Sequence, residues 1–287
     1  MDKHEIINFH NAYINEDETE LDRLWKQVAP KSLVKFFPAS YLSDGDNYSL
    51  KGINDKTLWL SSPKRFNDPL DCVMNIDYYK EGFDLSYKFL GSIVGDSQAE
   101  EILNSDYAKN ALLEIEKSMR LNFLQLRNKM EQSVYASCFS ESENVYSLIM
   151  WAHYANNHTG FCAEYDFAIV NNAVEFGCIP ILYTNDYSFN MHSTNVNENV
   201  KNILFFAFTK ALEWQNEREW RVAQINYNLN CDGYNINFSS PKQIYLGCRA
   251  SDRLKNDLIK ICETNNIPLY QMKLKPGTFT LIEERII

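Results

Sequence analysis

The stretch WAHYANNHTGFCAEYD, residues 151–166, carries two of the chain's five histidines, with a tryptophan, two tyrosines, a glycine and a cysteine. Its pattern predicts the end of a helix, a polar turn at residues 156–158 and a short buried strand at residues 161–165. A turn this rich in polar groups between two apolar elements is a usual place for a functional site. The same pattern also fits a well-packed corner whose polar groups are satisfied internally.

Before this stretch, the sequence predicts a helical lead-in at residues 1–30, ended by Pro30. The apolar runs that indicate strands lie at 32–39, 57–62 and 134–140. The longest helical pattern covers 97–130 and carries an interrupted apolar stripe. Asn144 is expected to cap the helix that enters the opening stretch.

After this stretch, strands are predicted at 179–184, 219–227 and 243–247, and a strong helix at 197–214. An amphipathic helix capped by Ser251 or Asp252 follows, and a hairpin around Pro276 and Gly277 closes the chain.

Strands and helices do not alternate regularly along the chain, which argues against a doubly wound parallel sheet. We therefore predict an α+β fold with mixed, mostly antiparallel sheets and flanking helices. After the lead-in at 1–30, residues 31–287 are expected to form a single domain with a helical insertion at about 84–131.

Composition excludes several classes of protein. The 45% hydrophobic and 14% aromatic content is enough for a sizeable core, and the formal charge of -10 argues against a broad duplex-binding surface. The seven cysteines form no C-x-x-C pair and indicate buried thiols in a reducing compartment. No leader pattern and no run of membrane-spanning length is visible, so we expect a cytoplasmic protein without a membrane partner. The histidines lack ligand spacing, so no metal site is predicted.

The segment EWQNEREWRVA, residues 213–223, is the strongest candidate for chemistry. If a strand begins near Glu217, its period of two places Glu217, Glu219 and Arg221 on one face. Two carboxylates so spaced can hold a sugar hydroxyl and stabilise an oxocarbenium ion, while Arg221 keeps one of them ionised. The alternative is a surface cluster in which the acids and the arginine simply pair.

A second candidate is SSPKRFNDPLD, residues 61–71. Either Ser61 or Ser62 braces a ligand-facing wall beside the two glutamates, or Asn67, Asp68 and Asp71 lock the loop without a ligand-binding role for the serines. Asn67 and Asp68 fit a structural role better, because their side chains can bond to the local backbone and fix the turn. Asn67 also stays a candidate ligand contact.

Four further side chains are candidate ligand contacts. Lys35 lies between apolar neighbours, so it faces either solvent or a cleft that takes an anionic ligand. Trp151, His153 and Tyr154 are expected to form a wall of that cleft, with His153 either a base, a phosphate donor or a core histidine.

The blocks SSPKRFNDPLDC, WAHYANNHTGFC and K-x-x-x-W-x-x-E-x-E-W-R occur in this order. Together they resemble a widespread bacterial family catalogued as a domain of unknown function and often encoded near phage-defence genes. The resemblance covers roughly residues 33–285. It implies a role in defence or toxicity and a protein partner encoded nearby.

A weaker resemblance is to ADP-ribosyltransferases, which place a basic residue, a serine strand and a late E-x-E in this order. Lys35, Ser61 or Ser62, and Glu217-x-Glu219 follow that order here. The resemblance implies a related fold and NAD as substrate. It also implies that Glu219 is the catalytic acid and that Glu217 orients the acceptor. The chain departs from the pattern in having lysine on the first strand and S-S-P in place of S-T-S.

The leading prediction is an NAD-dependent ADP-ribosyltransferase or NAD glycohydrolase acting in anti-phage defence or toxicity. The main alternative is a non-enzymatic sensor of a nucleotide-like ligand, or a protein-interaction module, built from residues 61–69 and 151–162. A metal-free nuclease ranks last, because it needs a basic groove and the lysines and arginines do not cluster.

Overall fold

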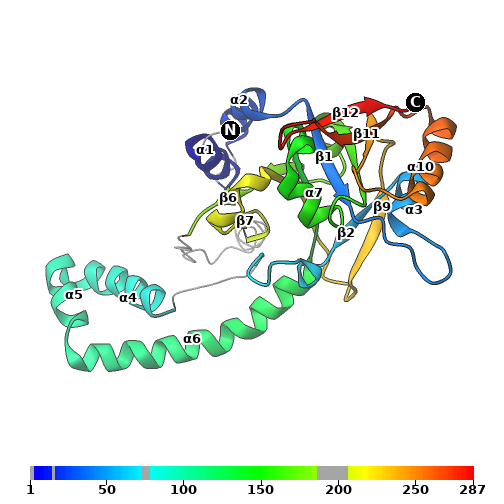
Figure 1. The fold of residues 1–287 in the computed structure, drawn as a ribbon. Helices are drawn as coiled ribbons and strands as arrows, with labels where there is room; N and C mark the ends of the chain where they lie inside the picture. Colours follow the sequence, from blue (N-terminus) through cyan, green and yellow to red (C-terminus); the bar gives the residue numbers. More distant parts are fainter. Residues whose placement is uncertain (1–2, 15–16, 73–77, 186–205) are drawn as a thin grey trace.

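The computed structural model describes residues 3–14, 17–72, 78–185 and 206–287 (Figure 1). A ten-stranded mixed sheet, mostly antiparallel, forms its centre, and helices pack around it. The predicted α+β class is therefore confirmed. No helix in these ranges is long and apolar enough to cross a membrane.

The strands of the main sheet are β1 (Ser32–Phe37), β2 (Thr57–Ser61), β3 (Val134–Glu141), β4 (Phe161–Asp166), β5 (Cys178–Pro180), β8 (Glu219–Ile225), β9 (Gly233–Asn237), β10 (Gln243–Leu246), β11 (Leu269–Leu274) and β12 (Leu281–Arg285). Their order is β12-β11-β10-β4-β1-β3-β2-β9, and β8 pairs with β3 and β5 off this path. A separate parallel pair joins β6 (Leu182–Tyr183) to β7 (Thr209–Lys210).

The described helices are α1 (Lys3–Ile14), α2 (Glu18–Val28), α3 (Tyr48–Asn54), α4 (Tyr78–Val94), α5 (Asp96–Leu103), α6 (Asp106–Ser133), α7 (Leu148–Tyr154), α8 (Phe167–Asn171) and α10 (Asp252–Asn265). Three short 3-10 helices are η1 (Pro63–Arg65), η2 (Ser142–Tyr146) and η3 (Leu212–Glu217).

Strand β3 pairs with all three strands that carry candidate site residues, β1, β2 and β8. On one side it pairs with β8 along its length. On the other side it pairs with β1 near its end and with β2 at Ala136. The three strands that carry the predicted site residues therefore all lie against β3.

The two faces of the sheet are covered differently. The largest core cluster joins the sheet to α3, α8 and α10. A smaller cluster on Val34 and Cys162 joins it to Trp151 of α7. A third cluster holds α1 and α2 against β5 and β6. Burial of apolar side chains in all three clusters, at about 25 cal/mol per Å² of apolar area removed from water, holds the layers together.

The predicted helix, polar turn and strand at residues 151–166 are confirmed. Asn156, Asn157 and His158 take positive φ values of 47°, 55° and 69° in succession, and they turn the chain from α7 into β4. Asparagine and histidine tolerate this left-handed region better than bulky or β-branched residues. At Gly160 an added Cβ would lie 2.0 Å from the Phe37 carbonyl oxygen, so only glycine fits.

Two of the expected helix features are wrong. Ser147, not Asn144, caps α7, with its hydroxyl oxygen accepting the Met150 N–H at 3.4 Å. Asn144 lies in η2 and bonds elsewhere. The predicted helix at 197–214 also ends early, because Thr209–Lys210 form a strand and Leu182 N–H donates to Phe208 C=O. Residues 197–205 of that prediction lie outside the described part.

Other elements follow the predictions closely. Ser251 caps α10, and β11 and β12 form the antiparallel hairpin around Pro276 and Gly277. Strand β9 was not predicted, because its sequence GYNIN is short and three of its five residues are glycine or asparagine, which are rare in strands. It pairs with β2 at the edge of the sheet.

Helices α4, α5 and α6 form an arm that projects from the sheet (Figure 1). The single helical pattern predicted at 97–130 is divided at Asn104, and Ser105 caps α6 by accepting the Ala108 N–H at 3.3 Å. Helix α6 returns to the body and passes directly into β3 at Ser133 and Val134.

Candidate functional site

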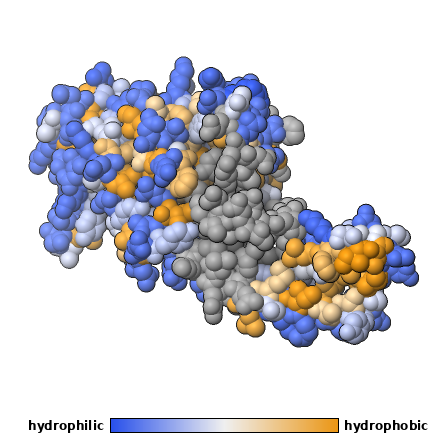
Figure 2. All heavy atoms as spheres, turned by 180° about the vertical axis from the view of Figure 1, so that it is seen from behind, coloured by the Kyte–Doolittle hydropathy of each residue, from blue (hydrophilic) through white to orange (hydrophobic). Residues whose placement is uncertain are grey.

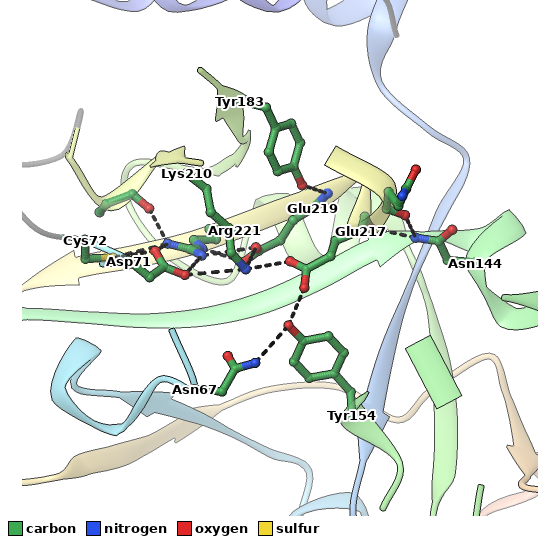
Figure 3. Close-up of polar contacts among 12 residues, drawn as sticks. Asn67, Asp71, Cys72, Asn144, Tyr154, Tyr183, Lys210, Glu217, Glu219 and Arg221 are labelled. Atoms are coloured by element: carbon green, nitrogen blue, oxygen red, sulfur yellow. Dashed lines mark hydrogen bonds and ion pairs between the residues drawn. The ribbon is translucent and has the colours of Figure 1, made fainter. Parts of the chain in front are cut away.

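A buried network of charged side chains lies beside β3 (Figure 3). It consists of Asp71 from the loop after η1, Lys210 from β7, Glu217 at the end of η3, and Glu219 and Arg221 from β8. All five side chains are buried. Buried charges are costly unless paired, so this cluster has to be internally balanced.

Arg221 is the centre of the network. Its guanidinium forms a two-point pair with Asp71, at 2.8 and 2.6 Å. It forms a second two-point pair with Glu219, at 2.5 and 3.1 Å. Nη1 also donates to the Ala207 carbonyl at 2.9 Å. The planar fork of arginine suits this arrangement, which a lysine could not reproduce.

Lys210 joins all three carboxylates. Its Nζ lies 2.6 Å from Glu217, 3.3 Å from Glu219 and 3.5 Å from Asp71. The same ammonium lies 4.7 Å from the centroid of the Trp214 ring, a cation–π distance.

The network holds three carboxylates and two cations, so one negative charge is left over when all five groups are ionised. Burial would raise the pKa of Glu219, but Arg221 and Lys210 outweigh it and lower that pKa to about 2. Burial and the charge of Glu219 raise the pKa of Glu217 to about 7, against the opposing effect of Lys210. The first proton taken up therefore belongs to Glu217.

Glu217 also marks the outer edge of the network. Its Oε1 accepts a hydrogen bond from the Tyr154 hydroxyl, and the exposed Asn67 amide donates to that hydroxyl at 3.4 Å. Burial and the nearby Glu217 charge raise the pKa of Tyr154, so the phenol stays protonated and keeps donating. A path of polar groups thus runs from the buried ions to the surface.

The local backbone explains how the two glutamates meet. Because β8 begins at Glu219, as predicted, Glu217 lies at the end of η3 and not on the strand face of Glu219 and Arg221. Arg218 adopts a left-handed conformation (φ 44°), and the Asn144 amide donates to the Glu217 carbonyl at 2.6 Å. The Tyr183 hydroxyl accepts the Glu219 N–H at 2.8 Å. Together these contacts position both glutamates.

Lys35 lies neither at the surface nor in the ion network. Its Nζ donates to the Cys138 carbonyl at 3.1 Å and lies 5.3 Å from the Phe139 ring centroid. Burial lowers the pKa of Lys35, while the negative field of Glu219 opposes that shift.

The two serines lie away from the glutamates. Ser61 pairs with Ala136, four residues along β3 from Ser140, which lies opposite Glu219. Four residues of strand correspond to about 13 Å. Ser62 is buried, and its N–H donates to the Asp232 carbonyl at 2.9 Å. The structure does not place either serine beside the glutamate pair.

The predicted aromatic wall on α7 consists of one buried residue, Trp151, and two residues beside the ion network, His153 and Tyr154. Trp151 is buried and donates its indole N–H to the Val145 carbonyl at 2.7 Å, which is a structural role. His153 is exposed, and its ring centroid lies 6.2 Å from those of both Tyr154 and Trp214. His153 and Tyr154 therefore border the outer edge of the network.

Asp71, Lys210 and Tyr183 are site residues that the sequence does not reveal. Asp71 lies in the loop after η1, yet it pairs with Arg221, 150 positions away. In that loop Asp68 has the local role, accepting the Leu70 N–H at 2.9 Å.

Residues 150–222 match the model of a protein family described as a protein of unknown function (DUF2971). The match covers the α7–β4 corner, Lys210 and the E-x-E segment, and it confirms the resemblance to a family of unknown function over these residues. Comparisons with curated proteins and with solved structures gave no significant match. Within the described ranges, no group of three or more acidic, histidine or cysteine side chains is arranged to hold a metal ion.

Proposed function

We propose that the chain is an NAD-dependent ADP-ribosyltransferase or NAD glycohydrolase that acts as an effector in bacterial defence or toxicity. The observation that supports this most is the state of Glu217, a carboxylate with a pKa near 7 at the outer edge of a buried ion network. A group that exchanges a proton near neutral pH is suited to general acid–base catalysis. Two neighbouring carboxylates with pKa values pushed apart commonly have separate roles.

In the proposed reaction, Glu217 is the catalytic base. Nicotinamide leaves NAD with the electron pair of the C1′–N bond, and it needs no proton because it leaves as a neutral molecule. The attacking water or acceptor hydroxyl forms the new C1′–O bond and gives its proton to Glu217. This reverses the assignment that the transferase resemblance implies: Glu219 is a positioning residue, since Arg221 and Lys210 bind its oxygens and hold its pKa at about 2, so it takes up no proton near neutral pH.

The edge of the network offers contacts for such a substrate. The ring of Trp214 and the rings of His153 and Tyr154 lie near one another beside the network, where Tyr154 bonds Glu217 and Trp214 contacts Lys210. A cationic nicotinamide ring is attracted to aromatic faces. The Asn67 amide adds an exposed donor beside Tyr154.

The test is nicotinamide release and label transfer from labelled NAD by the purified chain in the presence of a cell lysate. Glu217→Gln is expected to lower turnover by at least about 100-fold, as loss of a general base does. Glu213→Gln is the matched control, because Glu213 is an exposed acid on the same short helix η3. No turnover by the wild-type chain, or equal turnover by Glu217→Gln, would sink the proposal.

A second candidate function is a non-enzymatic sensor of a nucleotide-like ligand. The observation that favours it is that groups inside the network already take up the hydrogen bonds of Arg221. Its guanidinium N–H groups donate to Asp71, Glu219, Cys72 and Ala207. A sensor would bind NAD or a related nucleotide in a calorimeter without consuming it. His153→Ala would then weaken binding, and Glu217→Gln would leave it unchanged.

A further inference from the structure

Glu217 has little direct access to solvent. Its side chain is 8% exposed, and each carboxylate oxygen already accepts a hydrogen bond. Oε2 accepts from the Lys210 ammonium at 2.6 Å, and Oε1 accepts from the Tyr154 hydroxyl. These two groups in contact with the carboxylate are therefore the candidates for carrying a proton to it.

The Lys210 side of the carboxylate is closed to proton transfer. The Lys210 side chain is 3% exposed, and its ammonium also lies 3.3 Å from Glu219 and 3.5 Å from Asp71. Burial would lower the pKa of Lys210, but the three carboxylates around it outweigh that effect and raise the pKa. An ammonium in this setting keeps its proton and supplies positive charge only.

The Tyr154 side offers a route to a substrate. Tyr154 is the last residue of α7 and is only partly buried. Figure 3 shows its hydroxyl between Glu217 and the exposed Asn67, whose amide donates to it at 3.4 Å, a long hydrogen bond. A phenol oxygen can accept one proton while it donates its own, so this hydroxyl can link a substrate to the carboxylate.

The fold holds the Tyr154 hydroxyl in place. Trp151, one turn earlier on α7, is fully buried and donates its indole N–H to the Val145 carbonyl at 2.7 Å. The chain then leaves α7 through the left-handed turn at residues 156–158, where the His158 N–H donates to the Trp151 carbonyl at 3.1 Å. Proton transfer needs such fixed geometry, because donor and acceptor have to stay at hydrogen-bond distance.

We propose that the Tyr154 hydroxyl is a second catalytic group, which carries the proton of the attacking water or acceptor hydroxyl to Glu217. This relay rests on the proposed function, in which Glu217 is the base. The attacking O–H bond breaks and its proton joins the Tyr154 oxygen, while the phenolic O–H bond breaks and its proton joins Oε1 of Glu217. The electron pair of the attacking oxygen forms the C1′–O bond, and nicotinamide leaves with the pair of the C1′–N bond. Glu217 gains one proton, and Tyr154 ends as it began.

Two protons move in the proposed step. Burial and the nearby charge of Glu217 raise the pKa of Tyr154, so a free phenolate is unfavourable and the two transfers occur together. The rate of nicotinamide release by the wild-type chain in mixtures of H2O and D2O tests this. Two moving protons give a curved dependence of the rate on the deuterium fraction. A straight line, which indicates direct transfer to Glu217, overturns the relay.

A second test removes the hydroxyl with Tyr154→Phe, which keeps the ring. This substitution is expected to lower kcat for nicotinamide release at least about 100-fold, the scale for loss of a proton-transfer group, with KM unchanged. The control is Tyr146→Phe, because the Tyr146 hydroxyl also donates to a glutamate, Glu283, at 2.6 Å but outside the ion network. Tyr146→Phe is expected to leave kcat at the wild-type value.

The pH profile separates a proton carrier from a group that only tunes Glu217. Burial raises the pKa of Glu217 to about 7 and the Tyr154 hydrogen bond opposes that rise, so Tyr154→Phe also moves the increase of kcat with pH to higher pH. If tuning were its whole role, the variant would regain the wild-type kcat once Glu217 is ionised. The relay predicts a kcat at least about 100-fold low at every pH.

All variants are compared at one low chain concentration. Figure 2 shows apolar side chains on the surface of the arm, where Leu85, Phe89 and Ile93 of α4 are exposed. A fixed concentration keeps any association through this surface equal in every assay. Circular dichroism checks that Tyr154→Phe is folded, and the isotope measurement on the wild type decides the question even where that variant does not fold.

Failure of the relay and failure of the proposed function give different results. Turnover that requires Glu217 but not Tyr154 overturns the relay and leaves the proposed function standing. Recovery of the wild-type kcat by Tyr154→Phe at high pH has the same meaning. Absence of turnover in the wild type, or equal turnover by Glu217→Gln, overturns both.

Discussion

Arg221 holds together segments that are far apart in the chain, since its guanidinium pairs with Asp71 and Glu219 at full burial. Arg221→Lys should destabilise the fold, because a lysine ammonium cannot form two bidentate pairs and leaves buried carboxylates short of donors. The expected loss is about 3 kcal/mol of unfolding free energy, the scale for breaking a buried ion pair.

Denaturant unfolding measures this effect. Arg218→Lys is the control, because Arg218 is exposed and pairs with Glu141 only at 3.5 Å, and it should change stability by less than about 0.5 kcal/mol. Equal effects of the two substitutions would show that the network contributes little.

Glu217 should make stability depend on pH in an unusual direction. Its pKa is raised from 4.5 to about 7 in the folded chain, so the folded state binds more protons between these values. The stabilising contribution of the Glu217 proton is complete below pH 4.5 and is lost as the pH rises to 7. The stability of wild type relative to Glu217→Gln should fall by up to about 3 kcal/mol across this window.

The measurement is urea unfolding of wild type and Glu217→Gln at several pH values. Glu213→Gln, which removes an exposed acid from the same short helix, serves as the control. Glu219 contributes in the opposite direction, with stability lost as the pH falls from 4.5 toward 2, so it affects a separate acidic range. A flat difference between wild type and Glu217→Gln from pH 4.5 to 7 would contradict the raised pKa.

At the scale of elements, the corner between α7 and β4 depends on Gly160. Gly160→Ala should cost about 1–3 kcal/mol, because the new Cβ overlaps the Phe37 carbonyl of the neighbouring strand. Since β1 pairs with β4 over its whole length, the strain has to spread into the sheet. The expected readout is a lower melting temperature.

A second glycine substitution, Gly52→Ala, separates the steric effect of the added Cβ from its effect on the entropy of the unfolded chain. Gly52 lies in α3, where an added Cβ would be 3.5 Å from the nearest atom, an ordinary contact. Gly52→Ala should therefore leave stability unchanged or raise it by up to about 1 kcal/mol. A Gly160→Ala chain as stable as wild type would mean that the corner rearranges easily.

The elements differ in how far sequence predicts them. Apolar runs rich in β-branched and aromatic residues predicted β1, β3 and β8, because such runs fit a buried sheet. Edge strand β9 has little apolar character and was missed. The strand at Thr209–Lys210 was mistaken for helix, because its pairing with β6 is a tertiary contact that local propensity does not encode.

The site residues could also be predicted only in part from the sequence, for a different reason. The E-x-E spacing drew attention to Glu217 and Glu219, which the structure brings together at Lys210. The partner Asp71 is 150 residues away, and no local pattern specifies it. Lys35, Ser61 and Ser62 were assigned to the candidate site from the order of their strands along the chain. That order does not determine which side chains lie close together in the fold.

At the scale of the whole molecule, the arm and the sheet should differ in local stability. The arm buries few large side chains, whereas β1 and β3 are buried on both faces. Amide hydrogen exchange followed by mass spectrometry should show α4 and α5 losing protection in mild denaturant before β1, β3 and β8. Simultaneous exchange of arm and sheet would indicate one cooperative unit.

The direct passage from α6 into β3 has a mechanical consequence. No loop separates Ser133, the last residue of α6, from Val134, the first residue of β3. A rotation of the long helix would therefore act directly on the strand that pairs with β8. Twisting the far end of the arm would apply torque to the register that holds Glu219 and Arg221. A force on the far end of α6 would therefore act on β3 about 40 Å away, the length of the helix's 28 residues at 1.5 Å each.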